Sequence, residues 1–112
     1  MDLHNYPAAI AQVQCKLLIA NQEIEKISQA LSGICNQFEL QVAFDSKLKN
    51  EQQRKAKKAE FIRTSGDYEQ LSRQLADKTY NRDILLIQLE QFKNEFAVDG
   101  DARPKTLQAL GL

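Results

Sequence analysis

The side chains of this chain that could bind a ligand by charge are concentrated in one segment. Residues 47–63 contain seven cations against two anions, Glu51 and Glu60, a local net charge of +5 in a chain whose formal net charge is zero. Such a cluster attracts phosphates or carboxylates without reading a base sequence. An ordinary solvated helix surface is the other interpretation. The candidate contacts for nucleic acid or an acidic protein are Lys47, Lys49, Arg54, Lys55, Lys57, Lys58 and Arg63.

The remaining reactive residues do not form a catalytic or metal-binding set. His4 is the single histidine and lies near the N-terminus, so neither a Ser-His-Asp nor a Cys-His arrangement is indicated. Cys15 and Cys35 have no His-rich neighbourhood, so they predict no zinc site. On one helix they would stand roughly 30 Å apart, beyond disulfide reach. We therefore predict a protein that is not an enzyme and that uses no cofactor, metal or small-molecule substrate.

Composition favours an all-helical chain with a single domain over residues 1–98. Glycine occurs four times and proline twice, whereas residues that lose little rotamer freedom in a helix are abundant. A hydrophobic fraction of 43% with 27% charged residues is typical of folded domains. The apolar runs are far shorter than the roughly 20 residues of a membrane helix, and the first residues lack a signal-peptide pattern. We expect a cytoplasmic protein without membrane contact.

A heptad pattern predicts the first long helix, over about residues 7–38. Nine apolar positions repeat with spacings of three and four, the pattern of the a and d positions in a coiled coil. Pro7 suits a first helical turn, and Gly33 weakens the helix without ending it. The nine positions are Ile10, Val13, Leu17, Ala20, Ile24, Ile27, Leu31, Ile34 and Phe38.

The heptad pattern stops after this helix. Within residues 39–49, Leu40, Val42 and Phe44 occupy alternate positions, which is typical of extended backbone. The segment is therefore predicted to be extended and then to turn.

Two more helices are predicted after the turn. Asn50 is a good N-cap for a short helix over 51–63, and Asp67 is the predicted N-cap of a long helix over 68–98. Residues 99–112 form a tail, either docked or disordered, with leucines at Leu107, Leu110 and Leu112. We call the a and d positions through which two such helices pack their seam. In the last helix the seam positions are Tyr68, Leu71, Leu75, Lys78, Arg82, Leu85, Leu89, Phe92 and Phe96.

Two long helices of similar length with matching seams predict an antiparallel coiled-coil hairpin, with the short extended segment and the short third helix at its tip. The expected register places Ile10 opposite Phe96 and Lys78 opposite Ser28. Arg82 is then within reach of glutamates on the first helix. We interpret the two cations as polar seam residues that fix the register.

Two apolar runs, residues 17–20 and 84–87, fall at the same height of this hairpin. Each run is apolar around the whole helix, whereas one seam covers only one stripe. The uncovered side chains are expected to form an exposed apolar band, which usually marks an interface. We predict a homodimer, although the middle segment or the tail folding over the band is an alternative. The predicted dimer residues are Leu18, Ile19, Ile84 and Ile87.

Short motifs between residues 44 and 98 also resemble those of a known group of proteins. They are Lys49-Asn50-Glu51 with Arg54-Lys55-Ala56, then Asp67-Tyr68-Glu69-Gln70-Leu71, then Leu89-Glu90 with Lys93 and Phe96. In these motifs the chain resembles small uncharacterised coiled-coil helical-hairpin proteins of bacteria, including cyanobacteria, and of phages, plasmids and other mobile elements. The resemblance implies a helix that opens with the first motif, and a role near DNA recombination or repair.

Together these observations predict a non-enzymatic coiled-coil interaction or scaffold protein that is homodimeric. The alternative is a non-sequence-specific nucleic-acid-binding accessory protein of a phage or mobile element that uses the basic segment 47–63. A regulatory inhibitor that mimics or blocks a helical partner is a third possibility.

Overall fold

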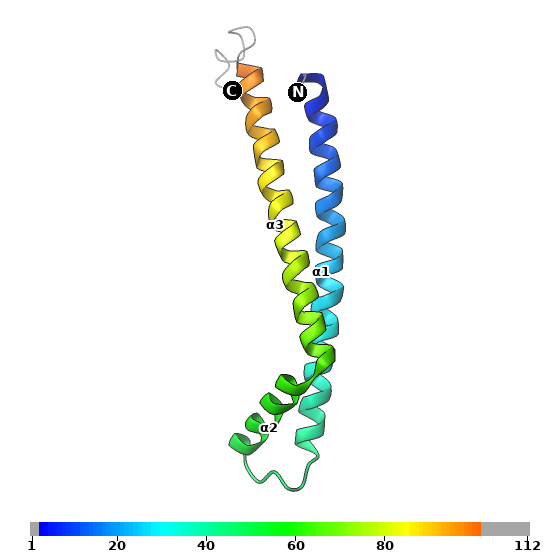
Figure 1. Cartoon of the computed structure of the whole chain (residues 1–112), viewed down its shortest axis with the longest axis vertical. Coiled ribbons are helices and arrows are strands. Elements are labelled where there is room, and N and C mark those ends of the chain that lie inside the picture. Colours follow the sequence, from blue (N-terminus) through cyan, green and yellow to red (C-terminus); the bar gives the residue numbers. More distant parts are fainter. Residues whose placement is uncertain (1–2, 102–112) are drawn as a thin grey trace. The chain divides into compact units, whose positions relative to one another are not determined.

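The structure, a computed structural model, describes residues 3–101 and the side chains within 3–98. This part of the chain contains helices and connecting turns and no strand, which confirms the prediction of an all-helical fold. The leucines predicted in the tail, at positions 107, 110 and 112, lie outside the described residues. The helices are η1, a short 3-10 helix at Leu3–Asn5, α1 at Tyr6–Ala43, α2 at Glu51–Thr64 and α3 at Gly66–Asp101 (Figure 1).

The chain divides into two compact units, each of which contains part of α1 and part of α3. Unit 1 takes α1 up to Asn21 and α3 from Tyr80 onward. Unit 2 takes α1 from Gln22, all of α2, and α3 up to Thr79. Each unit therefore brings together residues that are far apart in the sequence.

Unit 1 is held by side chains near the start of α1 and the end of α3. The rings of Tyr6 and Phe96 lie with their centroids 5.9 Å apart, and the Tyr6 hydroxyl donates a hydrogen bond to Glu95 Oε2 at 3.3 Å. Tyr6, Val13 and Leu17 are buried. The two buried aliphatic side chains belong to the predicted seam, so the heptad pattern identified the covered side of this segment.

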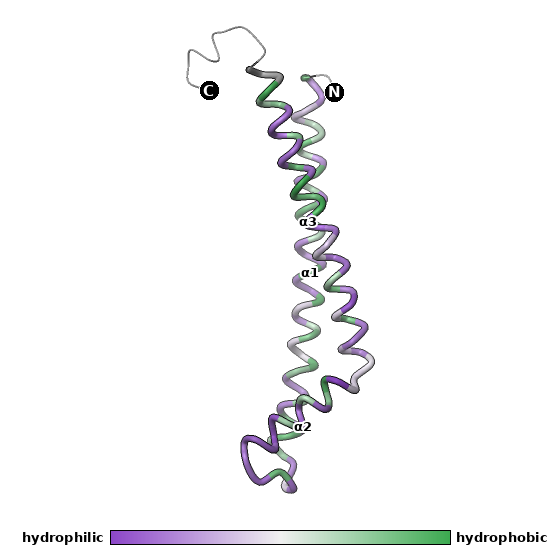
Figure 2. The backbone as a smooth tube through the Cα atoms, turned by 60° about the vertical axis from the view of Figure 1, so that its left-hand side comes forward, coloured by the Kyte–Doolittle hydropathy of each residue, from purple (hydrophilic) through white to green (hydrophobic). Residues whose placement is uncertain are grey.

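Unit 2 is held by contacts from α1 to both later helices. Phe38 of α1 packs against Phe61 of α2 with ring centroids 5.5 Å apart. Glu23 of α1 forms an ion pair with Lys78 of α3 at 2.7 Å. α2 is the most hydrophilic of the three helices along its length (Figure 2). Its attachment therefore depends on few apolar contacts.

The extended segment predicted over residues 39–49 is helical in its first part, because α1 continues to Ala43. A backbone hydrogen bond from Phe44 N to Leu40 O at 3.1 Å closes the last turn. Only Val42 of the three alternating apolar residues is buried, at 6% exposure. Val42 lies four residues after Phe38. The alternation of three and four would have placed the next seam residue three residues after Phe38, so the buried side of α1 continues with a different spacing. The turn itself occupies residues 44–50.

The contacts of the seam cations also differ from the expected register. Lys78 pairs with Glu23 and not with the region of Ser28, a difference of more than one helical turn. Arg82 pairs with its own neighbour Asp83 at 3.1 Å, and not with α1. The expected register placed Phe38 beside the start of the last helix, whereas Phe38 packs against Phe61 of α2.

The two helix starts after the turn are fixed by side-chain caps. Asn50 is the N-cap of α2, as predicted: its side chain accepts a hydrogen bond from Gln53 N at 2.8 Å. The N-cap predicted at Asp67 is wrong, because Ser65 takes this role two residues earlier. Ser65 has extended backbone, and its hydroxyl accepts a hydrogen bond from Tyr68 N at 3.1 Å. The break between α2 and α3 is therefore a single residue.

Replacing the α2 cap, Asn50→Ala, is expected to lower the free energy of unfolding by about 1 kcal/mol, since one orphan N–H of the first turn loses its partner. Urea unfolding followed by circular dichroism measures this loss. Asn36→Ala, an exposed position inside α1, is the matched control and should not lower stability, because alanine favours a helix interior more than asparagine does. Equal effects at both positions would contradict a capping role for Asn50.

Gly33→Ala is expected to raise the free energy of unfolding by about 1 kcal/mol. Gly33 lies inside α1, which runs through it as predicted, and a Cβ added there meets no atom within 4 Å. Thermal unfolding provides the measurement. The reverse change at a nearby exposed position, Ala30→Gly, should lower stability by a similar amount. A destabilised Gly33→Ala variant would show that this helix segment is not regular.

Candidate interaction surfaces

The four residues predicted for a dimer interface are all exposed, and all belong to unit 1. Their exposed fractions lie between 45% for Ile84 and 68% for Ile87. Leu86, which the sequence reading did not include, is exposed to 46%. We call these five side chains the apolar band: Leu18, Ile19, Ile84, Leu86 and Ile87.

The band arises because each apolar run surrounds its helix while the partner helix covers one side. Leu17 is 8% exposed, but its neighbour Leu18 is 61% exposed, since successive residues of an α-helix point about 100° apart. On α3, Leu85 is partly covered whereas Leu86 and Ile87 are exposed. The exposed side chains are aliphatic and carry no hydrogen-bonding group, so a hydrophobic surface is the one type of partner that they suit.

Three cations of the basic segment are already paired with carboxylates inside unit 2. Lys58 Nζ lies 2.5 Å from Glu39 Oε1 on α1, and this hydrogen bond raises the pKa of Lys58 above its usual value. The other two pairs lie within α2: Arg54 with Glu51 at 3.5 Å, and Lys57 with Glu60 at 3.3 Å. Lys57 also stands over the ring of Phe61, 5.2 Å from its centroid.

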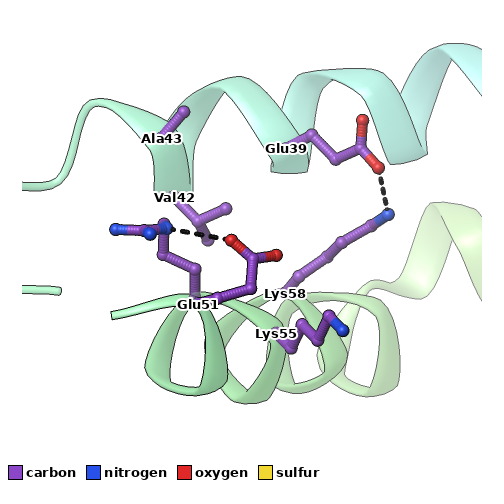
Figure 3. A pocket seen from close by; sticks show the side chains of 7 residues that line it. Glu39, Val42, Ala43, Glu51, Lys55 and Lys58 are labelled. Carbon is purple, nitrogen blue, oxygen red and sulfur yellow. Dashed lines mark hydrogen bonds and ion pairs between the residues drawn. The ribbon is translucent and has the colours of Figure 1, made fainter. Parts of the chain in front are cut away.

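These paired cations belong to the covered side of α2. Arg54, Lys58 and Phe61 follow one another at helical spacing, and all three are partly covered. The close-up in Figure 3 shows Lys58 of α2 extended toward Glu39 of α1. Glu51, also on α2, and Val42 of α1 line the same groove. Three cations, Arg54, Lys55 and Lys58, and two carboxylates line this groove, and the carboxylates pair with Arg54 and Lys58. Of the paired cations, Lys58 therefore joins α2 to α1.

The other four predicted contacts remain exposed and have no ion pair among the described residues. They are Lys47, Lys49, Lys55 and Arg63. The structure thus divides the seven cations of the prediction into a structural group of three and an available group of four.

The turn at residues 44–50 presents two of the available lysines on an ordered backbone. Asp45 Oδ1 accepts a hydrogen bond from Lys47 N at 2.9 Å, and Gln53 Oε1 accepts one from Lys49 N at 2.6 Å. Phe44 begins the turn and is 84% exposed, more than any other large hydrophobic side chain in the described part of the chain. The alternating sequence pattern did not indicate this exposure, because it placed Leu40, Val42 and Phe44 on the same face of an extended segment.

The residues considered for other chemistry are dispersed. Cys15 and Cys35 both lie on α1, as predicted, and neither forms a disulfide. Among the side chains that the structure describes, within residues 3–98, no three His, Cys, Asp or Glu are grouped so as to hold a metal ion. No helix in the same range combines the length and apolar character needed to cross a membrane. Comparisons with protein families, curated proteins and solved structures each find no match to this chain.

Proposed function

We propose that this chain is a non-enzymatic interaction protein, an antiparallel coiled-coil hairpin that forms a homodimer through the apolar band. Two contacts between α1 and α3 support the hairpin. Between Tyr6 and Glu23 the contacts advance by 17 residues along α1, while their partners, Phe96 and Lys78, go back by 18 residues along α3. Antiparallel helices in constant register require such a relation.

The main support for a homodimer is that the apolar band is exposed while the described part of the chain has a very small core. Four side chains are buried among the described residues: Tyr6, Val13, Leu17 and Val42. Two helices alone bury little apolar surface, so association provides the burial that the single chain lacks. Each band residue removed from water contributes free energy in proportion to its apolar area, at about 25 cal/mol per Å².

A second copy of the chain is the partner that suits the band best. A symmetric dimer places the same patch of each copy against itself, which requires a patch without uncompensated charge. The band meets this requirement because its five members are all leucine or isoleucine. A patch of this kind suits two helix pairs that pack into a four-helix bundle.

Light scattering coupled to size-exclusion chromatography tests this proposal. The expected mass is twice the 12.8 kDa of the chain across micromolar concentrations. A constant mass of 12.8 kDa at every concentration would overturn the dimer. It would leave the C-terminal tail or a different protein as the cover of the band.

A further inference from the structure

We propose that the turn at residues 44–50 and the start of α2 form a binding site for single-stranded nucleic acid. In this tip site, Lys47, Lys49 and Lys55 contact phosphates and Phe44 stacks on a base. The site is independent of the apolar band, since its residues all belong to unit 2 and those of the band to unit 1.

Three lysines of this site keep their charge unpaired within the described part of the chain. Lys47, Lys49 and Lys55 are exposed and have no carboxylate partner among the described residues. The two nearest acidic residues in the sequence are engaged elsewhere: Asp45 accepts the Lys47 backbone N–H, and Glu51 pairs with Arg54. The three ammonium groups are therefore available to a polyanion.

Phe44 is an exposed ring in the same turn as Lys47 and Lys49. Phe44 does not belong to the core, because the neighbouring Val42 already fills the position that faces inward. A ring that is 84% exposed gains free energy when it stacks on a planar apolar surface. Nucleobases provide such a surface, and stacking on an aromatic side chain is tolerant of base identity.

The combination favours a single strand over a duplex and over an acidic protein. Bases in a duplex are stacked on one another and leave no free face for Phe44, whereas a single strand presents both phosphates and unstacked bases. An acidic peptide would use the lysines but would gain little from the ring. A site with both features therefore matches single-stranded DNA or RNA.

Fluorescence anisotropy with a labelled 20-nucleotide oligothymidine and a 20-base-pair duplex tests the site at 50 and 200 mM NaCl. Three phosphate contacts predict a log–log salt slope of about −2 for the single strand, hence about 20-fold weaker binding at the higher salt. The duplex should bind at least about fivefold more weakly than the single strand at both salts.

Variants separate the two parts of the site. Lys47→Glu with Lys49→Glu should weaken single-strand binding at least about tenfold and reduce the salt slope. The matched control, Lys26→Glu with Lys93→Glu, alters net charge equally at two other exposed lysines and should weaken binding less than about twofold. Phe44→Ala should lose at least about fivefold in affinity, Phe44→Leu should lose a similar amount, and Phe44→Trp should retain binding.

Several results would overturn the proposal. They are no binding of the oligothymidine at 50 mM NaCl, equal losses in the two lysine double variants, equal affinity for duplex, or full displacement of the oligonucleotide by polyglutamate of equal charge. Circular dichroism verifies that each variant keeps its helices. The mass of each variant reports on the dimer separately, so failure of one proposal does not affect the other.

Discussion

Leu18→Glu combined with Ile87→Glu is expected to convert the proposed dimer into a monomer of 12.8 kDa. Both side chains are exposed in the single chain, at 61% and 68%, so the substitutions remove no core contact. In the dimer each glutamate would be buried against aliphatic side chains without a cation, which costs several kcal/mol. We expect the dissociation constant to rise by at least about 100-fold, or about 2.7 kcal/mol.

Sedimentation equilibrium over a range of concentrations measures this change. Leu40→Glu is the matched control, because Leu40 is similarly exposed at 58% but belongs to unit 2. The control variant should keep the dimer mass. A double variant that still sediments as a dimer would show that the band is not the interface.

Leu17→Ala is expected to lower the free energy of unfolding by about 2–4 kcal/mol, the range for truncating a leucine in a protein core. Leu17 is 8% exposed and is one of the few side chains that α1 buries in unit 1. Since the core is so small, the loss is a large fraction of the total stability. Urea unfolding at a fixed protein concentration provides the measurement, because the stability of a dimer depends on concentration.

The comparison with an exposed leucine isolates the effect of burial. Leu40→Ala removes the same atoms at an exposed position and should cost less than about 1 kcal/mol. Leu17→Ala should also weaken association, because the small core positions the band. A loss at Leu17 no larger than at Leu40 would mean that the first segment of α1 is not packed against α3.

The heptad pattern predicted most of the helical structure because hydrophobic spacing depends on local geometry alone. None of the nine seam residues predicted in α1 is exposed, and in α3 the one exposed seam residue is Phe96, which still contacts Tyr6. The pattern failed where two periods compete. A run such as Leu40 to Phe44 fits a strand and a helix equally well, and only packing decides between them.

The contacts between helices could not be predicted, because they depend on which side of α2 is covered. α2 has no apolar stripe in its sequence, so nothing indicated that Phe61 would pack on Phe38 or that Lys58 would pair with Glu39. This packing pairs one of the seven predicted cations, Lys58, with a carboxylate of α1, whereas two more pair with glutamates of α2 itself. The partner of Lys78 also differs from the predicted region of α1, since Lys78 pairs with Glu23.

The exposed band, in contrast, could be predicted, since it requires only that one seam covers one side of a helix that is apolar all around. The four residues named from the sequence are all exposed. Leu86 was not predicted because it lies next to the seam residue Leu85. Its exposure depends on how much of the surface of α3 around Leu85 is covered by α1. The exposure of Phe44 depends on where α1 ends, which the alternating pattern of residues 40–44 does not determine.

The most direct measurement is an isotope-filtered NMR experiment on a mixture of methyl-labelled and unlabelled chains. Nuclear Overhauser effects between copies should connect methyl groups of Leu18, Ile19, Ile84 and Ile87, and none should arise from Leu40. Intermolecular effects confined to other methyl groups, or their absence at millimolar concentration, would contradict self-association through the apolar band.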